Sequence, residues 1–172
     1  VRSVLADEPG LAAELVEPAA APLLAPLVAP PLTAHQAAGL DLILEGFLLH
    51  HGTPRHLRPA ASGREVLAGD YCYANGLVRI ASAGDLFTVE ALADLIALGA
   101  GIVAAGPRDA LVPLWRATTA AICARGRADQ DEIAARFLAA QDALRRAGDP
   151  SGLEVLAAGL PPTPGLAEAF GR

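Results

Sequence analysis

The apolar content of this chain is built mainly from alanine and leucine, and this feature constrains its fold more than any other. Both residue types favour helices, and the sequence contains no β-branched run of strand length. Hydrophobic residues make up 53% of the 172 residues and aromatic residues only 4%. A chain of this length can bury a substantial core as one domain. The expected fold class is therefore all-α, in the form of a helical bundle.

Capping signals and apolar periodicity divide the chain into three segments. Residues 1–32 are predicted to form a Pro- and Ala-rich N-terminal arm with short helices near 11–16 and 22–28. Residues 33–147 are predicted to form the helical bundle domain, and residues 148–172 a short helix followed by a loosely ordered tail. Within the bundle, apolar spacing predicts helices over 33–50, 62–83, 88–105, 109–125 and 128–147.

Polar residues mark the beginnings of three of these helices. Thr33 with Gln36, and Ser62 with Glu65, match the capping-box pattern, in which side chains and backbone N–H groups at a helix start bond reciprocally. Thr88 is expected to cap the helix that follows. These positions set the expected starts of the three central helices.

Small residues inside the helix over 62–83 indicate how it packs. Gly69, Ala74 and Gly76 would let a neighbouring helix approach closely. No internal repeat and no heptad seam is evident in the sequence. Pro113 is tolerable only in the first turn of the helix over 109–125, since proline lacks a backbone N–H.

Charge and cysteine content restrict the expected partners and compartment. A net charge of −6 excludes nucleic acid as an expected partner, because phosphate binding needs a clustered basic surface. Cys72 and Cys123 are expected as buried free thiols, which fits a reducing cytoplasm. No signal peptide is visible. The apolar stretch 11–32 contains two glutamates and five prolines, so no transmembrane segment is expected.

The stretch LHHGTPRHLRPAASGREVLAGDYCYANGLVRI, residues 49–80, resembles a segment of the trans-prenyl diphosphate synthase family. In that family a metal-binding helix is followed by a loop with a Gly-x-Pro motif and by a long helix that opens with Gly-Asp-Tyr. Gly52 and Pro54 match the loop, and Gly69, Asp70 and Tyr71 match the helix opening. The resemblance covers roughly residues 33–125 and implies a truncated, isoprenoid-synthase-like bundle.

The resemblance also assigns metal and diphosphate positions to this chain. The family's first aspartate motif would fall on Asp41, Leu42 and Glu45, and its paired arginines on His50 and His51. Its diphosphate-binding Lys-Thr motif has only a weak counterpart in residues 116–119, and its second aspartate motif would lie beyond residue 172. Family members use two carboxylate clusters to hold magnesium ions that neutralise the departing diphosphate. Half of this clamp cannot supply that neutralisation, so the chain alone is expected to bind no cofactor and to be no enzyme.

Some members of the family divide the labour between a full-length catalytic subunit and a shorter, catalytically silent one. The resemblance therefore implies a non-catalytic small subunit that shapes the product tunnel of a catalytic partner, with Mg²⁺ bound by that partner. The helices over 62–83 and 88–105 would contact the full-length synthase or a second copy of this chain. The alternative is a stand-alone helical protein that binds an isoprenoid or another lipid in a degenerate cavity. A third possibility is a true prenyltransferase with unusual metal ligands.

The residues that carry these assignments also have simpler interpretations. Asp41 and Glu45 lie four residues apart on one helix face, either as a residual metal or diphosphate ligand pair or as a solvated acidic face. Asp70 is expected to bond a neighbouring helix or an arginine. Tyr71, Tyr73 and Trp115 are expected as core or interface aromatics rather than as a cofactor site.

A basic cluster surrounds the Gly-x-Pro loop. Its histidines are not expected to converge on a metal, because adjacent histidines on a helix point in different directions. The end of a helix favours protonated histidine at these positions. The other interpretation is a diphosphate site, with histidines replacing the family's arginines at acidic pH. The cluster consists of His50, His51, His56, Arg55, Arg58 and Arg64.

Overall fold

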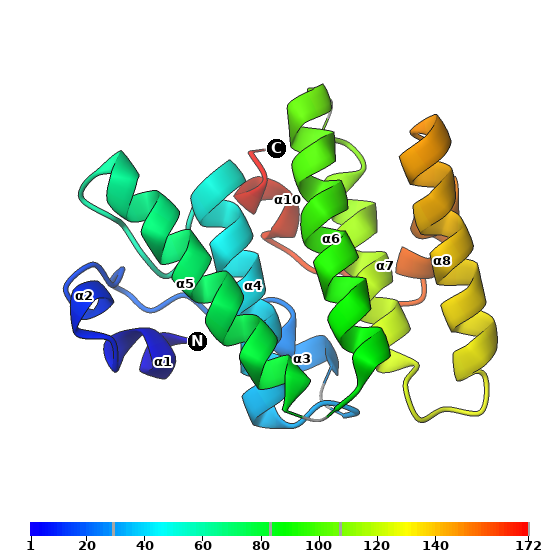
Figure 1. Cartoon of the computed structure of the whole chain (residues 1–172), viewed down its shortest axis with the longest axis horizontal. Helices are drawn as coiled ribbons and strands as arrows, with labels where there is room; N and C mark the ends of the chain where they lie inside the picture. Colours follow the sequence, from blue (N-terminus) through cyan, green and yellow to red (C-terminus); the bar gives the residue numbers. More distant parts are fainter. Residues whose placement is uncertain (29, 83, 107, 172) are drawn as a thin grey trace.

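The computed structural model describes residues 1–28, 30–82, 84–106 and 108–171 (Figure 1). These described residues form helices and contain no β-strand, so the expected all-α helical bundle is confirmed. The helices are α1 (Arg2–Ala6), α2 (Pro9–Ala12), α3 (Ala25–Val28), α4 (Ala34–His51), α5 (Ser62–Ala81), α6 (Leu86–Ala105), α7 (Leu111–Cys123), α8 (Gln130–Ala147), α9 (Ser151–Ala157) and α10 (Leu166–Ala169).

The helix α4 lies at the centre of the molecule and is buried on nearly all sides. The predicted capping box at its start is present: Thr33 Oγ1 accepts from Gln36 N at 3.3 Å, and Gln36 Oε1 accepts from Thr33 N at 2.9 Å. Helices α5 and α6 lie in front of α4 in Figure 1, and the short helix α10 lies behind it. A helix surrounded in this way has no single apolar stripe, because every face meets protein.

Glycines on both helices allow α4 and α5 to pack closely against each other. Gly39 and Gly46 on α4 face Gly76 and Gly69 on α5, and both pairs are seven residues apart, as expected for two antiparallel helices. A Cβ at Gly39 would lie 2.8 Å from the Gly76 carbonyl oxygen, and a Cβ at Gly46 would lie 2.9 Å from that of Gly69. The predicted close approach at Gly69 and Gly76 is therefore confirmed. The two helices share a heptad spacing of glycines that was not recognised in the sequence.

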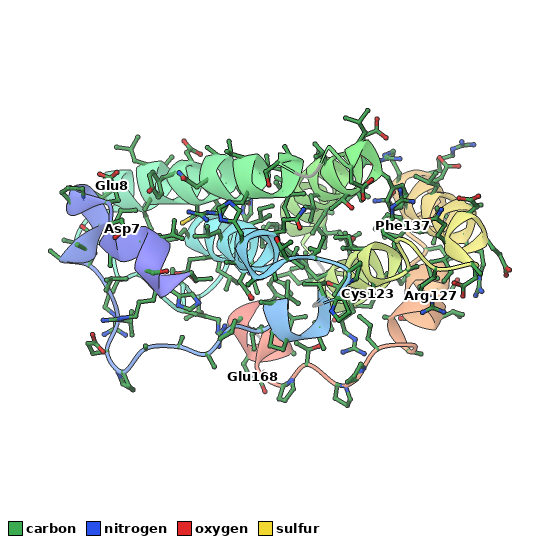
Figure 2. All side chains as sticks on the ribbon, turned by 90° about the horizontal axis from the view of Figure 1, so that it is seen from below. Asp7, Glu8, Cys123, Arg127, Phe137 and Glu168 are labelled. Atoms are coloured by element: carbon green, nitrogen blue, oxygen red, sulfur yellow. The ribbon has the colours of Figure 1, made fainter. Side chains whose placement is uncertain are left out.

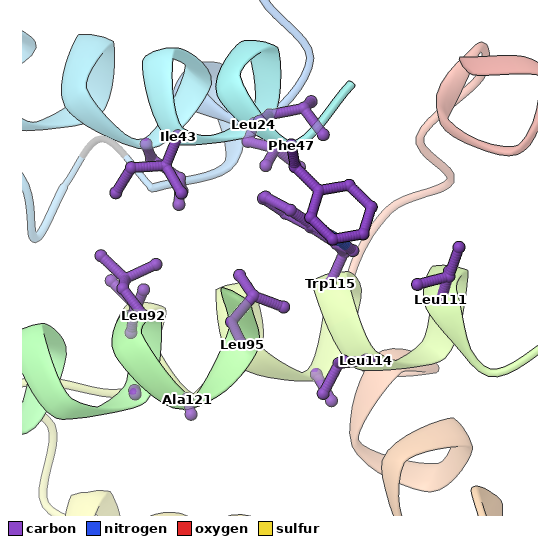
Figure 3. Close-up of a cluster of buried hydrophobic side chains, with 14 of the residues drawn as sticks. Leu24, Ile43, Phe47, Leu92, Leu95, Leu111, Leu114, Trp115 and Ala121 are labelled. Atoms are coloured by element: carbon purple, nitrogen blue, oxygen red, sulfur yellow. The ribbon is translucent and has the colours of Figure 1, made fainter. Parts of the chain in front are cut away.

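The main core lies between α4, α6, α7 and the C-terminal segment (Figure 3). Phe47 packs edge-on against Trp115 and Phe170, with ring centroids 5.5 and 5.7 Å apart. Leucines from α6 and α7 surround these rings, and Leu24 from the N-terminal segment also reaches them. The sequence interpretation of Trp115 as a core aromatic is confirmed, because its side chain is fully buried.

The N-terminal segment packs on this same chain and forms a second core. Its helices lie at Arg2–Ala6 and Pro9–Ala12, so the helix predicted near 11–16 is misplaced. Pro9 occupies the first turn of α2, where its missing N–H costs nothing, and Glu8 caps that turn. The second core consists of Val4, Leu5, Leu11, Leu42, Leu49, Leu57, Ala68 and Cys72.

The C-terminal tail is ordered, contrary to the sequence prediction. The guanidinium of Arg116 donates to the carbonyl oxygens of Ala157, Leu160 and Pro161 and to Thr163 Oγ1, at 2.8–2.9 Å. Phe170 then enters the main core with no exposed surface. The half-buried guanidinium of Arg116 and the buried ring of Phe170 thus hold a segment whose prolines gave no sign of order in the sequence.

Two helix starts differ from the predicted caps. The helix α5 is capped by the backbone of Ala61, while Ser62 is the first helical residue and its side chain lies outside the described part of the chain. The helix α6 begins at Leu86, because Asp85 takes the cap position and accepts a hydrogen bond from the Thr88 hydroxyl at 2.6 Å. Thr88 therefore lies inside the helix. Pro113 does fall in the first turn of α7, as predicted.

The helix α6 is long and apolar enough to cross a membrane by length and composition alone. Only 28% of its most apolar window is buried inside the molecule. A single helix of this kind is weak evidence for membrane insertion, since helices in the core of soluble proteins meet the same criterion. The prediction that the apolar stretch 11–32 is not a membrane span agrees with its division among short helices and loops.

The glycine contacts predict that two Gly→Ala substitutions change the free energy of unfolding in opposite directions. Gly76→Ala would place a methyl group 2.5 Å from Ile43 Cγ1 and 2.7 Å from the Gly39 carbonyl oxygen. The backbone cannot yield easily, so we expect a loss of about 1–3 kcal/mol in the free energy of unfolding. Gly101→Ala on α6 meets open space and should gain about 0.5–1 kcal/mol from lower backbone entropy. Urea denaturation measures both, and a stabilising Gly76→Ala would contradict the packing described.

Candidate functional site

The candidate site occupies α4 from Asp41 to its end, the loop over 52–61 and the first turns of α5. The structure brings most of the sequence-predicted residues into this region, but it distributes them over different surroundings. Each carboxylate of α4 faces a loop, whereas the histidines at the end of α4 face α5 and the C-terminal segment.

Asp41 holds the segment that begins α3. Its Oδ1 accepts hydrogen bonds from the backbone N–H groups of Leu23 and Leu24, at 2.9 and 3.0 Å, and its Oδ2 accepts from Ala25 at 2.7 Å. The first N–H groups of a helix have no partner inside the helix. Asp41 supplies those acceptors from a distant position in the sequence, so it caps α3 in place of a local residue.

Glu45 holds the loop that follows α4. Its Oε1 accepts from three successive backbone N–H groups, those of Arg55, His56 and Leu57, at 3.1, 2.8 and 3.0 Å. Its Oε2 receives only a second contact from Arg55 N, at 3.0 Å. Successive N–H groups that converge on one oxygen form a concave anion site. The carboxylate of this chain itself fills that site.

Both carboxylates are buried, with exposed fractions of 2% for Asp41 and 1% for Glu45. The alternative of a solvated acidic face is therefore wrong. Burial raises the pKa of each carboxyl group, and the backbone hydrogen bonds oppose that rise. Leu42, in the middle of the family's motif, packs into the second core. Cation binding is not needed to explain the position of either carboxylate.

His50 contacts α5 at the residues that match the family's helix opening. Its Nε2 lies 3.3 Å from Asp70 Oδ1, and its ring stacks on Tyr73 with centroids 5.3 Å apart. A Cβ at Gly69 would lie 2.5 Å from His50 Nε2, so only glycine admits the ring there. Asp70 therefore contacts the neighbouring helix α4 through His50, and its side chain is otherwise largely exposed. Tyr71 instead packs beside the second core.

The His51 ring lies 5.8 Å from the His50 ring, centroid to centroid, and borders the main core. This ring lies against Phe47, with centroids 4.8 Å apart, and the His51 carbonyl oxygen accepts from Arg108 Nη1 at 2.7 Å. Burial lowers the pKa of His51, and the charges of His50 and Arg108 lower it further. The expected protonation of this histidine at the helix end is thus opposed by its surroundings.

The loop between α4 and α5 is fixed by contacts from both ends of the chain. Thr53 N donates to the Ala169 carbonyl oxygen at 2.9 Å, and a Cβ at Gly52 would lie 2.7 Å from that same oxygen. The glycine is therefore required by close approach of the C-terminal segment. Pro54 follows at a half-buried position. On the other side, Leu57 pairs with Leu15 in an isolated antiparallel bridge.

The remaining basic residues of the loop do not gather into one site. Arg64 donates to the Glu14 carboxylate and to the Gly10 carbonyl oxygen, and Arg58 N donates to the Glu14 carbonyl oxygen. His56 is buried in the loop with 5% of its surface exposed. The predicted divergence does not hold for His50 and His51, because their ring centroids are 5.8 Å apart. Among the described residues, no group of three or more histidine, cysteine, aspartate or glutamate side chains is placed to hold a metal ion.

Three further candidates have structural partners. Arg116 binds the C-terminal tail, as described above, while Thr118 and Thr119 donate to carbonyl oxygens one turn earlier. Their match to a diphosphate motif therefore has no free donor in this structure. Cys72 is buried, which raises the pKa of its thiol to about 12. Cys123 donates to the Leu27 carbonyl oxygen, and both cysteines are free thiols, as predicted.

Sequence analysis missed the groups that organise this region. The partners of the two carboxylates are backbone N–H groups, which have no side-chain signature. Arg108 was also missed, although it donates to the carbonyl oxygens of His51 and Phe170 and so joins α4 to the C-terminal segment. A lone arginine next to a helix start gives no sequence signal for a contact this distant.

Comparison with protein-family models, curated proteins and solved structures finds no match for the chain. The family resemblance stays a prediction that rests on the loop and the helix opening. The residues that carry it, Gly52 and Gly69, are explained by close contacts within the fold.

The two buried carboxylates predict unequal effects of neutral replacements. Asp41→Asn removes one of two oxygens that accept separate N–H groups and turns an amide NH₂ toward the Ala25 N–H. The unsatisfied donor should cost about 1–3 kcal/mol in the free energy of unfolding. Glu45→Gln keeps one oxygen for all three donors and should cost less than about 1 kcal/mol. Chemical denaturation compares the two variants, and equal losses would contradict this geometry.

His56 predicts a pH dependence of stability. Burial lowers its pKa to about 4, and the charge of Arg55 adds to the shift. The unfolded ring titrates near pH 6.5, so the folded state binds fewer protons between pH 4 and 6.5. His56 thus contributes stability that is present above that range and lost as the pH falls through it, by about 3 kcal/mol.

His56→Gln removes this titration and leaves the carboxylates unchanged. Protonation of Asp41 and Glu45 acts in the opposite direction, because their pKa values are raised in the folded state. Both proteins share that effect, so the comparison isolates the histidine. Urea denaturation at pH 7 and pH 4.5 should show a drop in stability that is smaller for the variant by about 2–3 kcal/mol. Parallel pH profiles would count against a buried neutral His56.

Proposed function

We propose that the chain is a non-catalytic helical subunit that binds a full-length prenyl diphosphate synthase and shapes its product tunnel. The proposal extends the family resemblance of residues 49–80 with the surface chemistry of α5 and α6. It places the protein in the cytoplasm, where free thiols are maintained. The catalytic partner would hold Mg²⁺ on its own carboxylates.

The observation that carries the proposal is the apolar outer face of α5 and α6. Leu67 and Val78 on α5 expose 69% and 71% of their surface, and Leu86 on α6 exposes 73%. The rest of the exposed face of α6 is mainly small residues: Ala93, Ala97, Gly101, Ala104 and Ala105. Figure 1 shows α5 and α6 side by side in the front layer, and Figure 2 shows green α5 along one edge of the molecule. Exposed apolar surface of this kind is typical of protein contacts.

The carboxylates of α4 support the non-catalytic part of the proposal. A magnesium clamp needs carboxylate oxygens that face open space and substrate. Asp41 and Glu45 instead direct their oxygens at backbone N–H groups in buried loops. In a catalytic subunit such carboxylates would bind a metal ion, whereas in this chain they accept backbone hydrogen bonds that stabilise the fold.

Surface substitutions on α5 test the partner contact. Val78→Arg places a charge in the proposed interface, and Val155→Arg is the matched control on α9, where Val155 is 61% exposed. Both positions face solvent, so each change should alter the free energy of unfolding by less than about 0.5 kcal/mol. We expect the tagged chain to co-purify with a full-length synthase from the same genome, and recovery to fall at least about tenfold for Val78→Arg alone.

Product analysis separates the proposed role from simple association. The complex should form longer or more uniform prenyl products than the synthase alone, while the isolated chain forms none. Light scattering of the isolated chain shows whether the same face joins two copies. Absence of a co-purifying synthase together with no change in products would overturn the proposal, as would magnesium-dependent turnover by the chain alone.

A further inference from the structure

A groove runs between α6 and α8. Figure 1 shows the two helices on either side of α7, which lies behind them. Two successive cavities lie along this groove, with volumes of about 300 and about 500 Å³. Small-molecule sites typically fall in this size range. The ion pair between Asp94 on α6 and Arg145 on α8, at 3.3 Å, lies between them.

The larger cavity has an aliphatic lining. Its walls are Leu98 and Ile102 from α6 and Leu144 from α8, with alanines and glycines between them, and only Arg145 brings a charge to it. Gly101 also lines this cavity, and a Cβ added there meets no atom within 4 Å. Among the described residues, the lining contains no aromatic ring and no hydroxyl group. Such a surface suits a saturated or branched hydrocarbon chain.

The smaller cavity contains a buried amide that lacks partners. Gln141 is 1% exposed, and neither its Nε2 nor its Oε1 has a hydrogen-bond partner among the described residues. It lies one turn before Arg145 on the same face of α8 and lines the cavity with Phe87 and Leu138. An unpaired buried amide costs free energy that a ligand with both a donor and an acceptor would recover.

Charge around the groove selects the head group of such a ligand. Glu90 and Asp94 line the smaller cavity, and Arg145 lines the larger one. Asp94 already neutralises Arg145, so an anionic head would meet the remaining negative charge of Glu90. A cationic ammonium head would be attracted by Glu90, but it can only donate, so it would leave Gln141 Nε2 without an acceptor. A neutral hydroxyl group avoids both conflicts, and it can donate to Gln141 Oε1 while it accepts from Gln141 Nε2.

We propose that the groove between α6 and α8 binds a neutral aliphatic alcohol, with its chain in the larger cavity and its hydroxyl group on Gln141. The proposal uses neither the family resemblance nor the face of α5, although Ala97 and Gly101 of the exposed α6 face also line the larger cavity. Val78→Arg on α5 changes only the proposed synthase contact, and Gln141→Met changes only the groove, so these two variants distinguish the two proposals. Each additional methylene group buried in the larger cavity should tighten binding about threefold to fourfold.

The test uses 1-decanol, decanoate and decylamine as probes in calorimetric titrations of the full chain. We expect 1-decanol to bind at least about tenfold more tightly than either charged probe. Gly101→Leu projects into the larger cavity and should abolish binding, while it favours the helix and so preserves folding. Ala104→Leu is the matched control, because Ala104 is exposed on the same helix and does not line the cavity.

Gln141→Met tests the head group, because it keeps the length of the side chain and removes the donor and the acceptor. We expect it to weaken 1-decanol about tenfold and to leave circular dichroism and the denaturation midpoint at or above those of the unchanged chain. Equal binding of the three probes, or full affinity of Gln141→Met, would overturn the head-group assignment and leave water as the partner of the amide. Retained binding by Gly101→Leu, or no binding of 1-decanol at all, would overturn the site.

Discussion

The fold depends on the close approach of α4 and α5 at four glycines. Carbonyl oxygens of one helix occupy the space where a Cβ of the other would lie, at Gly39 against Gly76 and at Gly46 against Gly69. Since neither helix can shift outward without losing these contacts, the position of α5 fixes His50 and Tyr73 in their stacked arrangement. The same approach leaves the outer surface of α5 without a covering helix, because α5 contributes its inner face to α4.

A helix buried on all sides carries a second constraint, since its polar residues must find partners inside the protein. Asp41 and Glu45 meet this requirement by binding backbone N–H groups of two loops that lie far away in the sequence. The loops in turn gain acceptors that their own residues do not provide. One pair of carboxylates therefore couples the centre of the bundle to the N-terminal segment and to the loop over 52–61. Burial of the carboxylates would be unfavourable without these backbone N–H groups, and burial of the N–H groups would be unfavourable without the carboxylates.

Apolar spacing and helix-capping patterns predicted much of this fold from the sequence. The contacts between residues distant in the sequence could not be predicted in this way. Apolar spacing and the capping box at Thr33 and Gln36 located α4 to within one residue, and the five central helices follow their predicted ranges closely. The burial of Asp41 was missed, because its partners are main-chain amides with no residue signature. The ordered tail was missed for a similar reason. Arg116 binds carbonyl oxygens, which every residue possesses, so only the folded geometry reveals the contact.

The same amide contacts bear on whether the acidic pair could bind a metal ion. Backbone N–H groups present the positive ends of their dipoles to the oxygens of Asp41 and Glu45, so a cation at either carboxylate would face donors that repel it. It would also have to displace hydrogen bonds that keep α3 and the loop over 52–61 in place. Placing a carboxylate at Leu42 would not create a metal site, because that side chain lies in the second core, away from solvent. The carboxylate oxygens that a metal ion would need are therefore the same oxygens that stabilise this fold, and in this structure they accept hydrogen bonds from the backbone.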